Sequence, residues 1–587
     1  MYRSVSRALF GAALLSLSVA LHAQTTLDYV QTPATQAASA AYDDGYSIFQ
    51  PVLAQEAIVA TEEAHATEAA LAVLQEGGNV IDAAVTIGFT LAVTLPNAGN
   101  LGGGGFMLYH DAQDQQTYAI DFREVAPKGA HKDLFLDQEG NVIDGRSLYS
   151  HYAVGVPGTV AGLMDAYERW GSLPLERLLA PAIELAEQGF EVSPTLASAL
   201  ERTAERMGQW PATKEIFWRD GQPLQAGDTL TQADLAHSLR LIAEQGQDAF
   251  YRGPIADAIV KEMQDHQGAI TREDLEEYKV ILREPTVGQY RGYDIATMPP
   301  PSSGGVHILQ ILNMAEHWPL QDWGHNSAQT IHHLAEAMKF AYADRSTFLG
   351  DPDFVDIPLE GLLSKTYAAE LVEKINPEQA TPAEQIGAGN PSDHESEQTT
   401  HYSILDNQGN AVSVTYTLNT NFGSGIVVPG TGILLNNEMD DFSAKPGVAN
   451  AYGLIGGEAN AVEAGKRPLS SMTPTIVFAD GAPMLVTGSP GGARIITTVL
   501  QTLINALDFD MNPAQSAAAP RFHHQWLPDE LRIELGLSAD TIDRLQARGH
   551  EVSIKPTMGR TQTVQKRQDQ LQGYSDPRNP DGLTLGY

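Results

Sequence analysis

The chain changes from a helical to an alternating pattern of apolar residues near residue 399. From about Gly158 to Phe348 the pattern is mostly helical, interrupted by the turn PPPSSGG at 299–305. The segments HYSIL (401–405) and AVSVTYTL (411–418) instead alternate as strands do. Because helix-rich and hairpin-rich regions are separate along the chain, we expect an α+β protein in which helices cover antiparallel sheets.

The first hairpin places two threonine hydroxyls opposite each other. Its turn, DNQGN, centres on Gln408, so a simple register pairs Thr399 with Thr417. Taken alone, this is an ordinary threonine pair in a sheet. However, the preceding segment 377–398 is rich in Pro, Gly and Glu and has the composition of an accessible linker.

An accessible bond before Thr399 allows self-cleavage. The hydroxyl can attack the preceding carbonyl, and water can open the resulting ester. The new N-terminus would have an α-amine with a pKa of roughly 8, next to its own hydroxyl. Thr399 would then be both nucleophile and general base.

Further patterns place other candidate residues. Helices are expected over 64–75 and 80–93, and TYAIDFRE predicts a strand with Arg123 at its end. A second hairpin, PTIVFADGAPMLVTG, is followed by Gly491, Gly492 and a helical run, where backbone N–H groups could stabilise an oxyanion. An ordinary strand-to-helix turn is the alternative.

Several function classes are disfavoured. The run LGGGG lacks the Lys-Ser or Lys-Thr of a phosphate loop, and neither G-x-S-x-G nor H-E-x-x-H occurs. The pairs His332-His333 and His523-His524 are expected to be packing residues rather than metal ligands. With 36 Lys and Arg against 73 Asp and Glu, the net charge of −37 argues against a nucleic-acid partner.

The N-terminus predicts export. Residues 1–23 combine Arg3 and Arg7 with an apolar run and a small residue, Ala23, as a signal peptide does. Residues 24–55 are expected to form an irregular arm. No membrane span is expected, and the absence of cysteine excludes disulfides and thiolate chemistry. The mature protein is therefore expected to be periplasmic or secreted.

Several motifs together resemble the γ-glutamyltransferase (γ-glutamyltranspeptidase) family. They are QTTHYSILDNQGNAVSVTYTLNTNFGSGIVVPGTGILLNNEMDDFS, KRPLSSMTPTIV, GSPGGARIITTVLQ, APRFHHQWLPDEL and the closing SDPR with DGLTLGY. The resemblance implies a four-layer αββα fold of the N-terminal-nucleophile hydrolase type. It also implies self-cleavage at 398/399 into a large subunit, 24–398, and a small subunit, 399–587, which stay together as a heterodimer.

The resemblance also implies roles for individual residues. Thr399 matches the nucleophile, Thr417 its supporting hydroxyl, and Gly491 with Gly492 the oxyanion hole. Arg123, Ser470 and Ser471 match the residues that bind the α-carboxylate of the substrate. Asn419, Glu438 and Asp441 match those that bind its α-ammonium. Tyr452, within the segment 444–462, matches a tyrosine of a lid over the site. No cofactor and no metal are implied.

The implied reaction transfers a γ-glutamyl group from glutathione or a related compound to Thr399. Water then releases glutamate, or an amino acid or dipeptide accepts the group. Two alternatives remain open. One is a related acylase that cleaves glutaryl or cephalosporin side chains, against which Asn419, Glu438 and Asp441 argue. The other is an exported solute-binding protein without turnover, which would remain an uncut chain.

Overall fold

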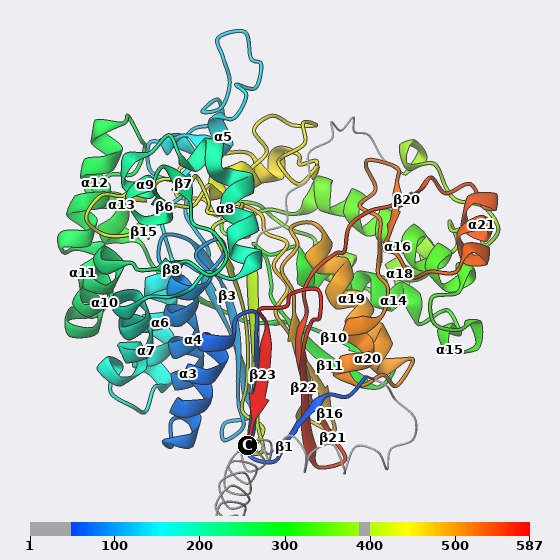
Figure 1. The fold of residues 1–587 in the computed structure, drawn as a ribbon. Coiled ribbons are helices and arrows are strands. Elements are labelled where there is room, and N and C mark those ends of the chain that lie inside the picture. The colour runs from blue at the N-terminus through cyan, green and yellow to red at the C-terminus, as the bar shows by residue number, and fades with distance from the viewer. Residues whose placement is uncertain (1–48, 387–398) are drawn as a thin grey trace, which may run out of the picture.

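The computed structural model describes residues 49–386 and 399–587. The predicted signal peptide, the arm before residue 49 and the second part of the predicted linker lie outside the described residues. Two central sheets face each other, and helices cover the outer face of each, as Figure 1 shows with both sheets seen edge-on. This arrangement is the expected four-layer αββα sandwich.

Both central sheets have seven strands, and all their neighbouring strands are antiparallel. The first sheet has the order β23 (Leu583–Gly586), β2 (Ala57–Thr61), β12 (Thr400–Asp406), β13 (Ala411–Thr417), β3 (Gly104–Asp111), β4 (Gln116–Phe122) and β9 (Ile281–Arg283). The second has the order β1 (Val52–Ala54), β22 (Gln570–Ser575), β21 (Gln562–Arg567), β17 (Ala482–Gly488), β16 (Thr475–Ala479), β11 (Tyr293–Thr297) and β10 (Thr286–Tyr290).

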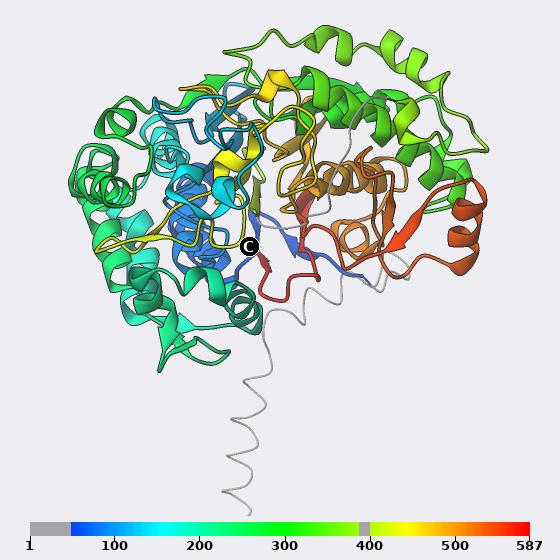
Figure 2. The same cartoon turned by 90° about the horizontal axis from the view of Figure 1, so that it is seen from above.

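The helices divide between the two outer layers (Figures 1 and 2). On the first sheet lie α3 (Ala64–Gln75), α4 (Val80–Thr94), α6 (Thr159–Trp170), α7 (Leu175–Gln188), α10 (Ala233–Gln245), α11 (Asp248–Tyr251), α12 (Pro254–Asp265) and α13 (Arg272–Glu277). On the second lie α14 (Gly304–Ala315), α16 (Ala328–Phe348), α18 (Lys365–Val372), α19 (Arg494–Leu507) and α20 (Pro513–Ala518). Other elements on the periphery include α5 (Arg146–Tyr149), η3 (His151–Ala153), α8 (Pro194–Met207), α9 (Pro211–Phe217), α15 (Leu320–Trp323), α21 (Ala539–Ala547) and η5 (Glu438–Asp441).

Helix α4 shows why the outer layers hold together. It is buried along its whole length, as its nearly continuous apolar sequence requires. A capping box begins it: the Asn79 side chain accepts from the N–H groups of Ile81 and Asp82, and the Asp82 carboxylate accepts from the Asn79 N–H. The hydroxyls of Tyr402 and Tyr416 donate to carbonyls of α4 at 3.0 Å, which fixes the helix against the outer face of β12 and β13.

The interface between the two sheets contains a polar layer behind the first residues of β12. The His401 ring lies 2.8 Å from the Thr415 hydroxyl and 3.0 Å from the Ser403 hydroxyl, and Ser403 donates to the Gln562 carbonyl on the other sheet. Burial lowers the pKa of His401 to about 3, so the ring is neutral. These bonds fix β12 to the second sheet next to Thr399.

The predicted hairpin register is confirmed. Thr400 pairs with Tyr416, which places Thr399 opposite Thr417. Helix α3 has the predicted bounds, α4 ends one residue later, and the second hairpin forms from β16 and β17.

Three expectations need correction. The predicted irregular arm, 24–55, includes an ordered strand, because β1 pairs with β22 at the edge of the second sheet. The mostly helical region 158–348 also contains β9 and the hairpin of β10 and β11. These strands are short, and β9 and β11 join the central sheets through distant partners, which leave little local signal. Part of the predicted linker, 377–386, is docked: Ala383 is buried, and its N–H donates to Asp529 at 2.8 Å. Residues 387–398 lie outside the described part of the chain.

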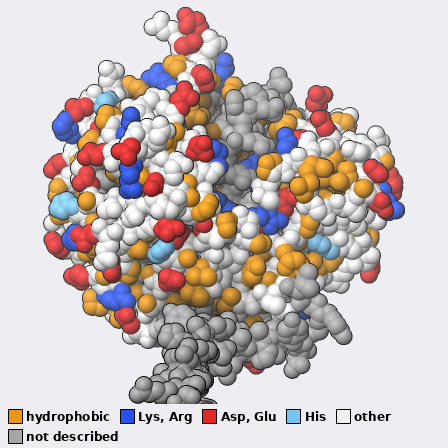
Figure 3. Space-filling view, viewed as in Figure 1, with side chains coloured by type: hydrophobic (Ala, Val, Ile, Leu, Met, Phe, Trp, Pro, Cys, Tyr) orange, Lys and Arg blue, Asp and Glu red, His pale blue; other side chains and the backbone are white. Residues whose placement is uncertain are grey.

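The surface agrees with the acidic composition. Acidic side chains are scattered over the face seen in Figure 3, with Lys and Arg among them. Over residues 49–386 and 399–587, none of the helices has the length and apolar character that crossing a membrane requires.

Candidate active site

The predicted site residues come together around one cavity, although they lie far apart in the sequence. Every one of them except Gly491 lines it: Arg123, Thr399, Thr417, Asn419, Glu438, Asp441, Tyr452, Ser470, Ser471 and Gly492. Sequence reasoning missed Leu454, Met472 and Ile495, which supply its apolar surface. Nothing in the local pattern distinguishes these three from ordinary core residues.

Thr399 lies at the start of β12, where the first sheet meets the cavity. Its side chain is buried, and its hydroxyl donates to the Thr417 hydroxyl across the hairpin at 3.4 Å. The Thr417 oxygen also accepts from the N–H of Asn419 at 2.8 Å. Asn419 has a φ of +77°, which asparagine tolerates better than most residues. The turn that positions Thr417 therefore also directs Asn419 into the cavity.

Gly491 and Gly492 form the turn between β17 and α19. Their φ values are +136° and +55°, and their carbonyls accept the first bonds of the helix from Arg494 and Ile495. Within residues 49–386 and 399–587, neither glycine N–H donates to a protein acceptor. Backbone N–H groups at a helix N-terminus that make no hydrogen bond to the protein are suited to stabilise a developing negative charge.

Tyr452 packs over this turn. A β-carbon on Gly492 would lie only 2.3 Å from the Tyr452 ring, so glycine is needed for space as well as for its φ. The Tyr452 hydroxyl donates to the Asn419 carbonyl. The loop around Tyr452 is tied to η5, since the Asn450 amide donates to Asp441 at 3.2 Å and the Ala451 N–H donates to Asp440 at 2.9 Å.

Arg123 is fully buried directly after β4. One end of its guanidinium bonds Glu438, and the other bonds Asp441 at 2.5 Å. Its Nε donates to the Pro468 carbonyl at 3.2 Å, and Glu124 lies 3.5 Å from the same guanidinium. Three carboxyl groups thus surround one cation.

Burial, together with the excess of carboxyl groups over cations around Arg123, raises the pKa values of these carboxyl groups. Burial raises the pKa of Glu438 well above its usual range, because the single guanidinium only partly offsets the loss of water and the neighbouring carboxylates. Burial likewise raises the pKa of Glu124 to about 7. The cluster therefore has more carboxyl groups than cations and retains protons, which a second cation bound in the cavity would displace.

Three buried polar atoms on the cavity wall have no hydrogen-bond partner among the described residues. They are Asn419 Oδ1, Glu438 Oε2 and Ser471 Oγ. Leaving such atoms unpaired costs about 1–3 kcal/mol each, so proteins retain them mostly where a ligand supplies the partner. Two acceptors and one hydroxyl around Arg123 suit a ligand that contains both an ammonium and a carboxylate group.

The serine pair is supported by residues that the sequence did not indicate as functional. Ser303, in the PPPSSGG turn, donates through both its N–H and its hydroxyl to the Ser470 carbonyl at 2.8 Å. Arg345 donates to the Ser303 hydroxyl at 3.0 Å. Burial lowers the pKa of Arg345 to about 10. The turn was recognised in the sequence, but its role depends on a partner 167 residues away.

The layered fold and a threonine hydroxyl at the cavity end of the central hairpin define the class of N-terminal-nucleophile hydrolases. Within that class, the γ-glutamyltranspeptidase family model matches residues 66–585. The chain therefore belongs to the γ-glutamyltranspeptidase family.

Individual relatives agree. The chain is 54% identical over 542 residues to the glutathione hydrolase proenzyme of Escherichia coli (strain K12), covering 92% of this chain and 93% of that protein. Its structure resembles a cephalosporin acylase from Bacillus halodurans, with a TM-score of 0.80, 29% identity, and coverage of 92% and 98%. It also resembles the γ-glutamyltranspeptidase of Helicobacter pylori, with a TM-score of 0.55, 44% identity, and coverage of 59% and 97%.

Proposed function

We propose that this chain is a γ-glutamyltransferase and glutathione hydrolase that acts after cleavage of its own precursor. The proposal rests above all on Asn419 Oδ1 and Glu438 Oε2, which have no hydrogen-bond partner in the described part of the chain and lie in the same cavity as Arg123 and Thr399. A γ-glutamyl group has a free α-ammonium for these acceptors and an α-carboxylate for Arg123 with Ser470 and Ser471.

The first step is maturation. The Thr399 hydroxyl attacks the carbonyl of residue 398, and hydrolysis of the ester leaves a large subunit, 24–398, and a small subunit, 399–587. The two remain a heterodimer because β12 and β13 lie between β2 and β3 in one sheet. The new α-amine is then positioned to accept the hydroxyl proton of Thr399.

The catalytic cycle uses the same hydroxyl. Thr399 attacks the γ-carbonyl of glutathione or another γ-glutamyl compound, while the N–H groups of Gly491 and Gly492 stabilise the oxyanion. The amine of Thr399 gives its proton to the leaving amine. Water then releases glutamate from the γ-glutamyl ester, or an amino acid or dipeptide takes up the acyl group. The predicted signal peptide places this reaction in the periplasm or outside the cell.

The similarity to a cephalosporin acylase makes a glutaryl substrate the specific alternative. A pair of chromogenic substrates, γ-glutamyl-p-nitroanilide and glutaryl-p-nitroanilide, differs only in the α-ammonium. We expect kcat/KM to favour the γ-glutamyl compound by at least about 100-fold, because the glutaryl compound leaves buried acceptors unpaired. Equal values or a glutaryl preference would identify an acylase, and binding without release of p-nitroaniline would identify a solute-binding protein.

A further inference from the structure

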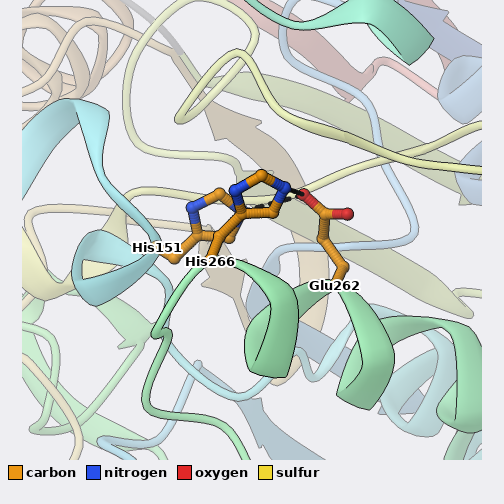
Figure 4. Close-up of side chains that lie close together, drawn as sticks. All are labelled: His151, Glu262 and His266. Carbon is orange, nitrogen blue, oxygen red and sulfur yellow. Dashed lines mark hydrogen bonds and ion pairs between the residues drawn. The ribbon is translucent and has the colours of Figure 1, made fainter.

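Outside the cavity, two histidines and a glutamate meet on the outer helical layer of the first sheet. His151 begins η3, Glu262 lies in the last turn of α12, and His266 directly follows that helix. Figure 4 shows both rings directed at the same carboxylate oxygen. The Nε2 atoms of His151 and His266 lie 2.9 Å and 3.5 Å from Glu262 Oε1.

Local packing brings these residues together. Glu262 and His266 are four residues apart, which places them on one face of the helix. After the helix, Gln267 has a φ of +59° and turns the chain, and Gly268 then lies against His151 so closely that a β-carbon would be 3.0 Å from His151 Cβ. The Trp210 ring packs edge-on against both imidazoles at centroid distances of 5.2 and 5.7 Å.

The three donors match the ligands that zinc prefers. Two imidazoles and a carboxylate are a common zinc set with three protein ligands, which leaves one position for water. Bonds of about 2 Å at tetrahedral angles place donor atoms about 3.3 Å apart. Here one ligand atom from each residue lies within 4.8 Å of the other two, so modest movements suffice.

One ring has to turn for a metal to bind. The imidazoles are nearly parallel, with an interplanar angle of 12° and a centroid distance of 4.7 Å, whereas a metal lies in the plane of each ring that binds it. The His266 side chain is 46% exposed and can rotate, while those of His151 and Glu262 are 4% and 9% exposed and are held in place. The exposed side of His266 also provides an entry path from solvent.

A second cluster with similar donors is a poorer candidate. In the group His332, Glu336 and His550, the Lys339 ammonium lies 3.0 Å from Glu336 Oε1, where it would repel a metal ion. The His332 Nε2 faces the Asn376 carbonyl at 2.8 Å, so it must carry a proton there. None of the ion pairs found among the described residues brings a Lys or Arg side chain to Glu262.

We propose that His151, Glu262 and His266 form a binding site for a first-row divalent transition metal, with zinc the preferred ion. The site is independent of the cavity that contains Thr399. It fastens η3 to α12, and the segment just before η3 contacts η5, since the Ser147 hydroxyl donates to Asp440 at 2.6 Å. Bound zinc should therefore stabilise the folded protein.

The test measures zinc binding by the untagged, processed protein after chelator treatment and dialysis. We expect one equivalent of Zn²⁺ per heterodimer, and a rise in Tm on adding zinc. In His266→Asn the zinc affinity should fall at least about 100-fold. Mutating a residue that only hydrogen-bonds a metal ligand typically lowers metal affinity about 10–100-fold, and loss of the ligand itself costs more. The rise in Tm should disappear as well.

His237→Asn is the matched control, since His237 is an exposed helical histidine outside the cluster. It should bind zinc as the wild type does. Cobalt binding adds a second readout, because Co²⁺ in a site with three protein ligands has visible d–d absorption that His266→Asn should lose. The proposal is overturned if the wild type binds no zinc, if His266→Asn retains it, or if only His550→Gln abolishes it.

Discussion

Arg123 is the residue whose surroundings most clearly require a ligand. Its guanidinium is fully buried and bonds Glu438 and Asp441, the same carboxylates proposed to receive the substrate ammonium. A γ-glutamyl ligand would add one anion and one cation to this cluster, so each charge inside it gains an opposite neighbour. The arrangement therefore selects zwitterionic head groups over singly charged ones.

Arg123→Ala should weaken recognition of the α-carboxylate. Truncating a buried, hydrogen-bonded charge costs about 2–5 kcal/mol, so we expect KM to rise at least about 30-fold. The decisive comparison uses a γ-glutamyl substrate and its α-carboxamide. Wild type should prefer the free acid strongly, and the variant should not. An Arg123→Ala enzyme that still prefers the acid would refute the assignment, while the exposed-arginine variant Arg252→Ala should match wild type.

The sequence could locate the residues proposed to contact the ligand but not those that support them. Thr399, Arg123 and Asn419 stand in recognisable motifs. Arg345 and Ser303 act through the Ser470 carbonyl, and Met472 and Ile495 line the cavity only because separate elements meet there. Such roles arise from tertiary packing, which local patterns do not report.

Among the elements, the turn between β17 and α19 requires glycine at position 492 both for its backbone conformation and for space. Gly492 needs a positive φ and also has the Tyr452 ring where a side chain would lie. We expect Gly492→Ala to lower kcat by about 10²–10³-fold, because the oxyanion donors are displaced. Steady-state kinetics on a γ-glutamyl anilide measure this directly.

Gly481→Ala controls for the backbone effect alone. Gly481 has a φ of +81° in the turn between β16 and β17, with nothing within 4 Å of an added β-carbon. The substitution should lower Tm through local strain and leave kcat unchanged. If both variants lose activity equally, strain rather than the oxyanion contact explains the loss.

Elements with strong local signals were predictable, and those defined by distant pairing were not. Both the β12–β13 hairpin and its register were predictable. The centre of the turn sets which residues pair, and the alternation of apolar residues identifies the strands. Strands β10 and β11 form a local hairpin across the turn at 291–292, which the mostly helical surroundings obscured. The place of this hairpin in the second sheet depends on the pairing of β11 with β16, 178 residues or more further along the chain. Long-range pairing of this kind has no counterpart in a local window.

On the scale of the whole molecule, buried charge links the parts that cleavage would separate. Glu62, directly after β2, is fully buried, and Arg560 from the C-terminal part lies 3.3 Å from its carboxylate. Burial raises the pKa of Glu62 to about 7, despite the nearby guanidinium. The folded protein thus holds this proton more tightly than the unfolded chain does.

The raised pKa of Glu62 makes the stability of the folded protein depend on pH. Between the ordinary carboxyl pKa and about 7, the folded state binds more protons, so the contribution of Glu62 to stability falls as pH rises through this window. Above pH 7 the ionised group costs about 3 kcal/mol. Glu62→Gln should therefore raise Tm at pH 8 and have little effect at pH 4.5. A gain in Tm that is the same at both values, or that is matched by the exposed variant Glu201→Gln, would contradict this.

Residues 381–383, in the last described part of the proposed large subunit, are also held in place. Residues Thr381 and Ala383 donate their N–H groups to Glu336 and Asp529, and Trp526 donates to the Ala383 carbonyl at 2.9 Å. Lys339 bridges the two carboxylates at 3.0 and 3.3 Å. The contacts to Trp526 and Asp529 would keep the two subunits together after cleavage, because they join residues on both sides of position 399.

Thr399 is proposed to become the N-terminal nucleophile, and sequencing the N-terminus of the smaller fragment shows whether cleavage exposes it. Wild type should yield a fragment that begins at Thr399. Thr400→Val is the matched control, because the buried Thr400 hydroxyl has no hydrogen-bond partner among the described residues, and it should be cleaved at the same bond. Thr399→Ala should remain a single inactive chain. A fragment that begins elsewhere, or normal cleavage of Thr399→Ala, would contradict the account.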